Sequence, residues 1–228
     1  MTASGTRPIR CVLLFSRSTR EEIAAKRLPG CAPLFELSRR RVIEAVASLP
    51  GVDLFTPRQR GSGFGQRLLN ALLDARELGY REIVAVPADT PALDRARLVE
   101  AFAALESHST ALGRAADGGV YLIGVTARAD PARLLSGVRW RTAGVFGDLV
   151  SNAPGAAVLD AELADIDHRQ DLVAMSARDD LDARLAALIL ALLWRPVLPR
   201  PGAERRAESR RHAIRLTDRS PPGASASI

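Results

Sequence analysis

Apolar residues follow two different spacings along the chain, and their alternation predicts strands separated by helices. Continuous apolar runs are typical of strands covered on both faces, whereas apolar residues spaced three and four apart are typical of helices with one buried face. Strands are predicted at Cys11–Phe15, Val52–Phe55, Arg81–Val86, Thr110–Ala115, Gly119–Val125 and Ala156–Leu163. Helices are predicted at Phe35–Leu49, Gly65–Gly79, Arg95–Glu106, near Pro131–Leu135 and Gly144–Val150, and between Asp179 and Trp194.

This order of elements predicts an α/β domain of three layers, in which a mostly parallel sheet lies between two layers of helices. Ligands of such sheets usually bind at the carboxyl ends of the strands. The domain is expected to span residues 8–195. Residues 196–228 are rich in Pro, Arg, Ser and Ala, and they are predicted to form a disordered tail.

Composition restricts the class of protein. The 228 residues are 47% hydrophobic, which is enough for one domain with a full core. Seven Arg and three acids after residue 195 contribute +4 of the net charge of +6, so the domain itself carries +2. With 4% aromatic residues and no basic stripe, the chain is not expected to bind nucleic acid. Cys11 and Cys31 are expected to be free thiols, and no apolar run is long enough to span a membrane, so a cytoplasmic protein is expected.

The stretch "VAVPADTPALD" places a carboxylate just after a predicted strand. Asp89 or Thr90 could cap the helix that follows, with Pro91 at its first position. However, Asp94 is itself a suitable cap, which leaves Asp89 at a strand end without a structural role. A carboxylate in this place suits Mg²⁺ or Mn²⁺, which bind carboxylates together with substrate phosphates.

The stretch "ADIDHRQDL" supplies two further acids. Asp165 and Asp167 share a face if the backbone is extended, and one of them could complete a metal site with Asp89. Alternatively, Asp167 and Gln170 form the capping-box pattern of a helix that begins near His168. His168 is expected to be an exposed turn residue.

Glycines and basic residues mark three more loops. Asp117-Gly118-Gly119 is either a hairpin turn or a place where a sugar or acceptor approaches the backbone closely. The glycines of "RGSGFGQR" do not match a dinucleotide fingerprint, so this stretch is expected to be a loop that opens a helix. Residues Arg17, Arg20, Lys26 and Arg27 follow the first strand, and they either neutralise a diphosphate or form a solvated basic face.

Taken in order, the first strand, the Arg- and Lys-containing loop, "RQRGSGFGQRL", "VPADTPALD", "ADGGVYLIG", "VRWRT" and "DIDHRQDL" resemble one family. The chain resembles, over about Ile9–Leu172, the bacterial GT-A-type glycosyltransferase-like proteins, a group that includes arsenosugar-biosynthesis glycosyltransferases. More distantly it is similar to the nucleotidyltransferases of molybdenum-cofactor and coenzyme synthesis. In one respect it differs, because the family's Pro-x-x-Gly and Lys-Thr-Arg-Leu loop is here "RSTREEIAAKRL", and this loop is expected to be rebuilt as a helical turn.

The resemblance implies a GT-A (nucleotide-diphospho-sugar transferase) fold and a metal-dependent transfer from a nucleotide-diphosphate sugar to a small-molecule acceptor. Asp89 and Asp117 would be catalytic, and Mg²⁺ or Mn²⁺ would be bound by Asp89 and Asp167. The expected ligand contacts are Arg17, Lys26 and Arg27 at the diphosphate, and Gly118, Gly119 and Trp140, with Thr142, at the sugar or acceptor. A nucleotidyltransferase that releases pyrophosphate and a non-catalytic nucleotide-binding protein are the alternatives.

Overall fold

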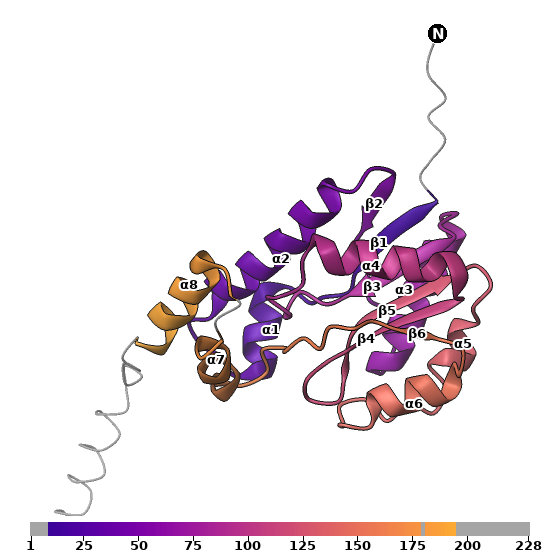
Figure 1. Cartoon of the computed structure of the whole chain (residues 1–228). Coiled ribbons are helices and arrows are strands. Elements are labelled where there is room, and N and C mark those ends of the chain that lie inside the picture. Colours follow the sequence, from indigo (N-terminus) through magenta and orange to yellow (C-terminus); the bar gives the residue numbers. More distant parts are fainter. Residues whose placement is uncertain (1–8, 179–180, 195–228) are drawn as a thin grey trace, which may run out of the picture. The chain divides into compact units, whose positions relative to one another are not determined.

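The computed structural model describes residues 9–178 and 181–194 (Figure 1). The strands are β1 (Arg10–Leu14), β2 (Val52–Phe55), β3 (Glu82–Val86), β4 (Thr110–Arg114), β5 (Val120–Thr126) and β6 (Ala157–Val158). The helices are α1 (Thr19–Lys26), α2 (Ala32–Ala47), α3 (Phe64–Glu77), α4 (Arg95–Ser107), α5 (Pro131–Leu134), α6 (Val145–Asn152), α7 (Arg169–Ser176) and α8 (Ala183–Leu193). Contacts within the chain define one unit that ends at Leu193 and another that begins at Trp194.

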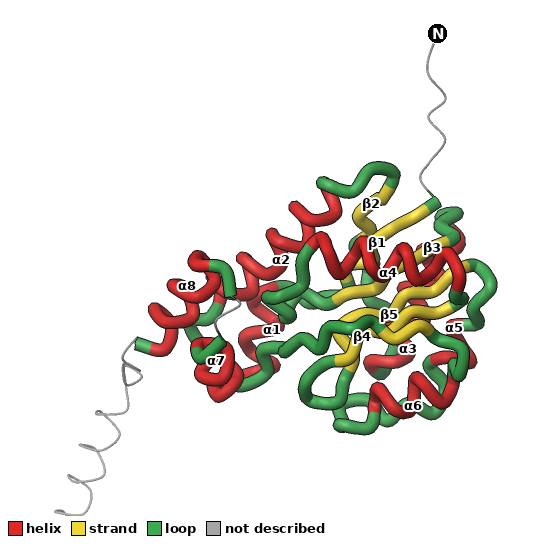
Figure 2. Tube along the Cα trace, viewed as in Figure 1, coloured by secondary structure: helices red, strands yellow, loops and turns green. Residues whose placement is uncertain are grey.

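The six strands form one sheet in the order β2-β1-β3-β5-β4-β6 (Figure 2). The pairs β1–β2, β1–β3 and β4–β6 are parallel, whereas β5 is antiparallel to both β3 and β4. The mostly parallel sheet confirms the predicted fold class. Because β5 runs opposite to β3, the turn that joins β4 to β5 lies at the same edge of the sheet as the carboxyl ends of β1 and β3.

Alternate residues of each central strand pack into different helical layers, as the period of two in a strand requires. On β1, Val12 and Leu14 pack in a core with α2 and α4, whereas Cys11 and Leu13 pack in a second core with α3, α5 and α6. All four side chains are fully buried. The continuous apolar run that predicted this strand therefore reflects a sheet covered on both faces (Figure 1).

A third apolar cluster lies where α7 and α8 pack against the start of α2. Leu185, Ile189 and Leu192 of α8 are buried in this cluster, so the apolar face of the last described helix packs within the domain. Cys31 is also buried there and Cys11 is buried in the sheet, and the two cysteines form no disulfide with each other, as expected. None of the described helices is long and apolar enough to cross a membrane.

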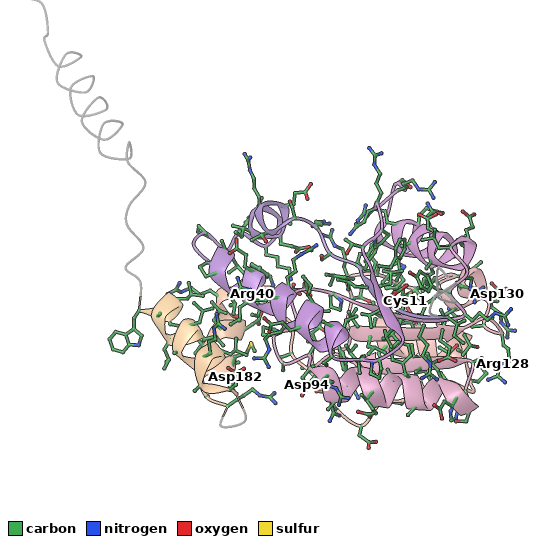
Figure 3. All side chains as sticks on the ribbon, turned by 90° about the horizontal axis from the view of Figure 1, so that it is seen from above. Cys11, Arg40, Asp94, Arg128, Asp130 and Asp182 are labelled. Atoms are coloured by element: carbon green, nitrogen blue, oxygen red, sulfur yellow. The ribbon has the colours of Figure 1, made fainter. Side chains whose placement is uncertain are left out.

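The N-cap of α4 explains where this helix begins and shows that Asp94, not Asp89, caps it. Asp94 is the N-cap of α4, and its side chain accepts a hydrogen bond of 3.0 Å from the backbone N–H of Arg97 (Figure 3). Asp89 is therefore not needed as a cap, which confirms the division of roles expected from the sequence. Likewise, α3 begins at Phe64 after an N-cap at Gly63, so "RGSGFGQR" is a loop that opens a helix.

Three local predictions differ from the structure. The strand predicted at Ala156–Leu163 is reduced to the two residues of β6, with one isolated bridge between Ala115 and Leu163. The helical turn expected after β1 is the complete helix α1, closed by a capping box between Ser18 and Glu21. The helix predicted at Phe35–Leu49 is α2, which begins earlier, at Ala32. Helix α8 lies between Asp179 and Trp194, as predicted, and the predicted tail lies outside the described residues.

Candidate active site

A cavity of about 930 Å³ lies at the sheet edge where β1 and β3 end. Its walls come from the loop after β1, the last turn of α1, the residues after β3, the β4–β5 turn, the start of α3, the loop around Trp140 and the loop before α7. Most of the residues predicted for the site line it: Arg17, Lys26, Arg27, Asp89, Asp117, Gly119, Trp140, Thr142 and Asp167. Gly118 is not among the lining residues, although its two neighbours in the turn are.

Lys26 is the centre of the acidic end of this cavity. Its ammonium forms ion pairs with Asp89 and, at 2.8 Å, with Oδ1 of Asp167, and it donates a hydrogen bond of 2.7 Å to the carbonyl oxygen of Ile166. Its side chain is 12% exposed. Burial opposes the charge on this lysine, but Asp89 and Asp167 outweigh burial and hold the pKa of Lys26 above its ordinary value. The only lysine of the chain is thus a fixed cation between two acids.

Backbone pairing explains why acids far apart in the sequence meet here. The backbone N–H of Ile166 donates a hydrogen bond of 3.0 Å to the carbonyl oxygen of Asp89, so the segment before α7 lies beside the segment after β3. Ile166 itself is fully buried in the third apolar cluster, and this burial anchors the segment before α7. Side chains on either side of Ile166 then face the cavity.

Asp165 and Glu22 add two more acids to the same end. Asp165 accepts a hydrogen bond from the hydroxyl of buried Thr90. Burial, and next the charge of Asp89, raises the pKa of Asp165 to about 8. The same two causes raise the pKa of Glu22, which lies 4.0 Å from the ammonium of Lys26. The acidic end therefore holds more carboxylates than Lys26 alone neutralises, and it favours an additional cation.

The oxygen atoms around Lys26 have the chemistry of a divalent-metal site. Two carboxylates and one carbonyl converge on the ammonium, and Oδ1 of Asp89 is buried with no hydrogen-bond partner among the described residues. Within the described part of the chain, no three His, Cys, Asp or Glu side chains gather as a complete metal cage. Mg²⁺ typically takes one or two carboxylates and fills its remaining positions with phosphates and water. Asp89, Asp167 and the carbonyl of Ile166 therefore fit such an ion, provided that Lys26 moves aside.

The start of α7 corrects one prediction about Asp167. The helix is capped at His168, and the backbone N–H groups of Asp167 and His168 both donate to Oδ2 of Asp171, at 2.8 and 2.6 Å. The predicted capping box of Asp167 with Gln170 is wrong, because Asp171, at the third position of the helix, accepts these hydrogen bonds instead. Asp167 is left available for the cavity, and His168 is exposed, as expected.

The Asp117-Gly118-Gly119 stretch is a hairpin turn, and the turn also supports the loop that carries Trp140. Oδ1 of Asp117 accepts a hydrogen bond of 2.8 Å from the backbone N–H of Gly119. The carbonyl of Gly118 accepts one of 3.0 Å from the backbone N–H of Phe146. A Cβ atom on Gly118, whose φ is +85°, would lie 2.9 Å from the Cα of Ala143. The predicted hairpin turn is therefore confirmed. The close approach seen at Gly118 is to the protein's own backbone, and contact of this stretch with a sugar or acceptor stays a prediction.

We expect Gly118→Ala to lower the free energy of unfolding by about 2 kcal/mol. The positive φ strains any residue other than glycine, and the new methyl group collides with the backbone of Ala143. Gly137→Ala is the matched control, since Gly137 also has a positive φ (+67°) but no atom within 4 Å of an added Cβ. That control should cost about 1 kcal/mol through strain alone. Urea unfolding of both variants measures the difference, and equal losses would contradict the role of Gly118 as a contact point.

An aromatic cluster also lines the cavity, and of its members only Trp140 was predicted from the sequence. The rings of Phe64 and Trp140 lie 4.8 Å apart, and those of Phe15 and Phe64 lie 5.5 Å apart, edge to face. Gly65 lets this happen, because a Cβ atom there would lie 3.1 Å from Cδ1 of Trp140. Phe64 lies among three glycines within five residues, Gly61, Gly63 and Gly65, so the sequence suggested a loop where the first residue of α3 is an aromatic side chain.

Comparisons with known proteins agree with this architecture. Residues 38–142 match the model of a family described as "Uncharacterized protein conserved in bacteria (DUF2064)". No curated protein matches the sequence. Among solved structures, the fold is similar to that of a proposed nucleotide-diphospho-sugar transferase from Desulfovibrio desulfuricans G20, with a TM-score of 0.69 and 21% identity over 81% of this chain and 96% of that one. This likeness confirms the predicted nucleotide-diphospho-sugar transferase fold.

Two weaker likenesses carry no argument, because their TM-scores are below 0.5. One is to a homologue, from Mycobacterium sp. strain JC1, of the Mycobacterium tuberculosis protein Rv0371c, with a TM-score of 0.49 and 16% identity over 82% of this chain and 100% of that one. The other is to a glycosyltransferase involved in glycosylation of the major capsid protein of the virus PBCV-1, with a TM-score of 0.43 and 14% identity over 66% of this chain and 82% of that one.

Proposed function

We propose that this protein is a metal-dependent glycosyltransferase, which moves a sugar from a nucleotide-diphosphate sugar to a hydroxyl group of a small-molecule acceptor. The observation that carries the proposal is the convergence of Asp89, Asp167 and the carbonyl of Ile166 on one cation just beyond the carboxyl end of β3. Ligands of open α/β sheets bind at this edge. The similarity of the fold to a proposed nucleotide-diphospho-sugar transferase supports the class of donor.

In this reaction the bond between the anomeric carbon and the diphosphate oxygen breaks, and the anomeric carbon forms a bond with the acceptor oxygen. A divalent ion held by Asp89 and Asp167 would act as a Lewis acid that stabilises negative charge on the leaving diphosphate. Lys26, displaced from the two acids, and Arg17 and Arg27, which line the same end of the cavity, would neutralise the phosphates.

Asp117 is the proposed acceptor of the proton that the acceptor hydroxyl loses. It lies in the cavity wall, and its Oδ1 is held by the backbone N–H of Gly119, so the carboxylate is fixed with Oδ2 facing no described donor. A base must reach the proton directly or through one water molecule. Trp140 and Gly119, in the same wall, would contact the sugar or the acceptor.

A thermal-shift panel of nucleoside diphosphates and nucleotide sugars, with Mn²⁺ and with EDTA, tests the proposal. A ligand at 100 times its dissociation constant stabilises the folded state by about 2.7 kcal/mol, so the correct donor should raise the melting temperature by several degrees only when Mn²⁺ is present. The donor found in this way is then incubated with a mixture of small hydroxylated compounds, and the products are identified.

The products separate the three possible functions. Release of a free nucleoside diphosphate together with a glycosylated product supports the proposal. Release of pyrophosphate from a nucleoside triphosphate identifies a nucleotidyltransferase instead. Stabilisation by a nucleotide with no turnover of any substrate identifies a non-catalytic nucleotide-binding protein.

A further inference from the structure

Two arginines of the cavity wall have no anionic partner among the described residues. Arg67, on α3, is half-buried, and Arg141, directly after Trp140, is exposed; both line the cavity. No carboxylate in the described part of the chain forms an ion pair with either. A half-buried guanidinium without a counter-ion has lost part of its hydration and retains five unused donors, so it favours a bound anion.

The acids of this region are already committed to other arginines. Asp148 binds Arg139 through three hydrogen bonds of 2.8 to 3.0 Å, and this pairing lowers the pKa of Asp148 to about 2. Asp74, on the same helix as Arg67, is paired with Arg60. The two free guanidinium groups are therefore not explained by a general lack of acids nearby.

The backbone at Arg141 supports a ligand-binding role. Its φ is +67°, a left-handed conformation that costs a residue with a side chain roughly 1 kcal/mol or more. Gly137, four residues earlier, takes the same φ with a glycine, so the loop contains glycine where only backbone geometry matters. The strained backbone at Arg141 thus holds an arginine side chain in the cavity wall at a position where a glycine would cost less.

The two arginines come from other elements than the groups proposed to bind the donor diphosphate. The donor, as proposed, binds at the acidic end, where Lys26, Asp89 and Asp167 meet. Arg67 lies on α3, three residues after Phe64, and Arg141 follows Trp140, and the rings of Phe64 and Trp140 lie 4.8 Å apart. We infer that the acceptor carries a carboxylate or a phosphate group, bound by Arg67 and Arg141, next to the hydroxyl that receives the sugar. This inference rests on the proposed function.

The test measures acceptor binding without donor and without metal, so that it does not depend on catalysis. Glycerate, glycerol 3-phosphate and neutral glycerol are titrated into the protein by calorimetry at millimolar concentration. We expect one of the two anions to bind and glycerol not to bind, and the preferred anion identifies the group as carboxylate or phosphate. If neither anion binds, or if glycerol binds as well as they do, the inference is wrong.

Three variants assign the binding to the two arginines. Arg67→Gln and Arg141→Gly should each weaken binding of the anion by about tenfold or more, the usual effect of losing a charge-assisted hydrogen bond. Arg141→Gly also relaxes the strained backbone, so its loss of binding cannot come from unfolding. Arg133→Gln, which removes an equal charge from an exposed position outside the cavity wall, should leave binding unchanged. An equal effect of Arg133→Gln would overturn the inference.

UDP and GDP binding, measured with Mn²⁺ in the same variants, distinguishes the acceptor from the donor. If Arg67→Gln weakens the binding of a nucleoside diphosphate as much as it weakens the binding of the anion, the guanidinium binds the donor and the inference is wrong. If the anion depends on both arginines but no sugar is transferred to any compound, the proposed function fails while the anion site stands.

Discussion

Asp89→Asn should lower the rate of sugar transfer at least about 100-fold at saturating donor and Mn²⁺, the usual cost of removing one preorganised charge-stabilising group. The substitution keeps the shape of the side chain and removes the negative charge that, together with Asp167, faces the cation position. It also replaces one carboxylate oxygen by an amide NH2 group, in a side chain whose Oδ1 is buried without a partner among the described residues. The rate is measured as release of nucleoside diphosphate.

Asp94→Asn is the control for this prediction. Asp94 lies five residues further along and caps α4, and asparagine caps helices as well as aspartate does, so both activity and stability should stay near those of the unchanged protein. Circular dichroism and the melting temperature confirm that each variant is folded. Turnover by Asp89→Asn at the unchanged rate, with Mn²⁺ present, would show that the acid after β3 has no part in the reaction.

Lys26→Met should lower the free energy of unfolding by about 3 kcal/mol in the presence of EDTA. Removing one partner of a buried ion pair leaves an uncompensated charge and typically costs 3 to 5 kcal/mol. We expect the lower end of this range, because the side chain of Asp167 is 49% exposed and solvent weakens its ion pair with Lys26. Urea unfolding measures the change, and Arg60→Met, which breaks an ion pair whose arginine is 61% exposed, should cost less than about 1 kcal/mol.

The same variant tests whether Lys26 and a metal ion compete for one position. Without the ammonium, Mn²⁺ no longer has to displace a cation from Asp89 and Asp167, so calorimetry should show tighter Mn²⁺ binding to Lys26→Met than to the unchanged protein. Added Mn²⁺ should then recover much of the lost stability. Weaker Mn²⁺ binding to the variant would mean that Lys26 organises the acids for the metal rather than occupying its place.

The sheet and its covering helices could be predicted because their patterns are dictated by burial. The apolar runs of β1, β3 and β5 exist because both faces of the sheet are covered, and the helical spacing in α3 and α4 exists because one face of each helix is buried. The existence of these elements therefore followed from the sequence alone, with ends accurate to a few residues.

Elements that bury little could not be predicted in the same way. Helix α1 has no fully buried residue and no apolar stripe, so only its capping residues, Ser18 and Glu21, mark it. Strand β6 lies at an edge and pairs through two residues, because the chain beyond it crosses to Leu163 without continuing the ladder. The predicted strand was too long because its pairing is interrupted: Leu159 and Leu163 donate backbone hydrogen bonds to the carbonyl oxygens of Leu112 and Arg114, but the backbone N–H of Asp160 between them donates to the side chain of Glu100.

The sequence predicted that Asp89 and Asp167 belong to the acidic end of the site, but not how its residues are arranged. The positions of Asp89 after a strand and of Asp167 before a helix are visible in the sequence, and the structure brings both to one point. The ion pair of Lys26 with these acids was not foreseen, since α1 had to form before the lysine could reach them. Arg67 was missed because a single arginine on an amphipathic helix is ordinarily a solvated residue, and only the fold shows that it lines the cavity.

The assembly of the acidic end has a consequence for biosynthesis. Lys26 and the carbonyl of Ile166 are separated by 140 residues of sequence, and the sheet between them must form before they can meet. A nascent chain therefore cannot complete this cluster until nearly the whole domain has left the ribosome. Under the proposed function, a ligand that depends on this cluster can bind only after the segment up to Asp167 has been translated, and a polypeptide that stops before Asp165 would not bind the donor.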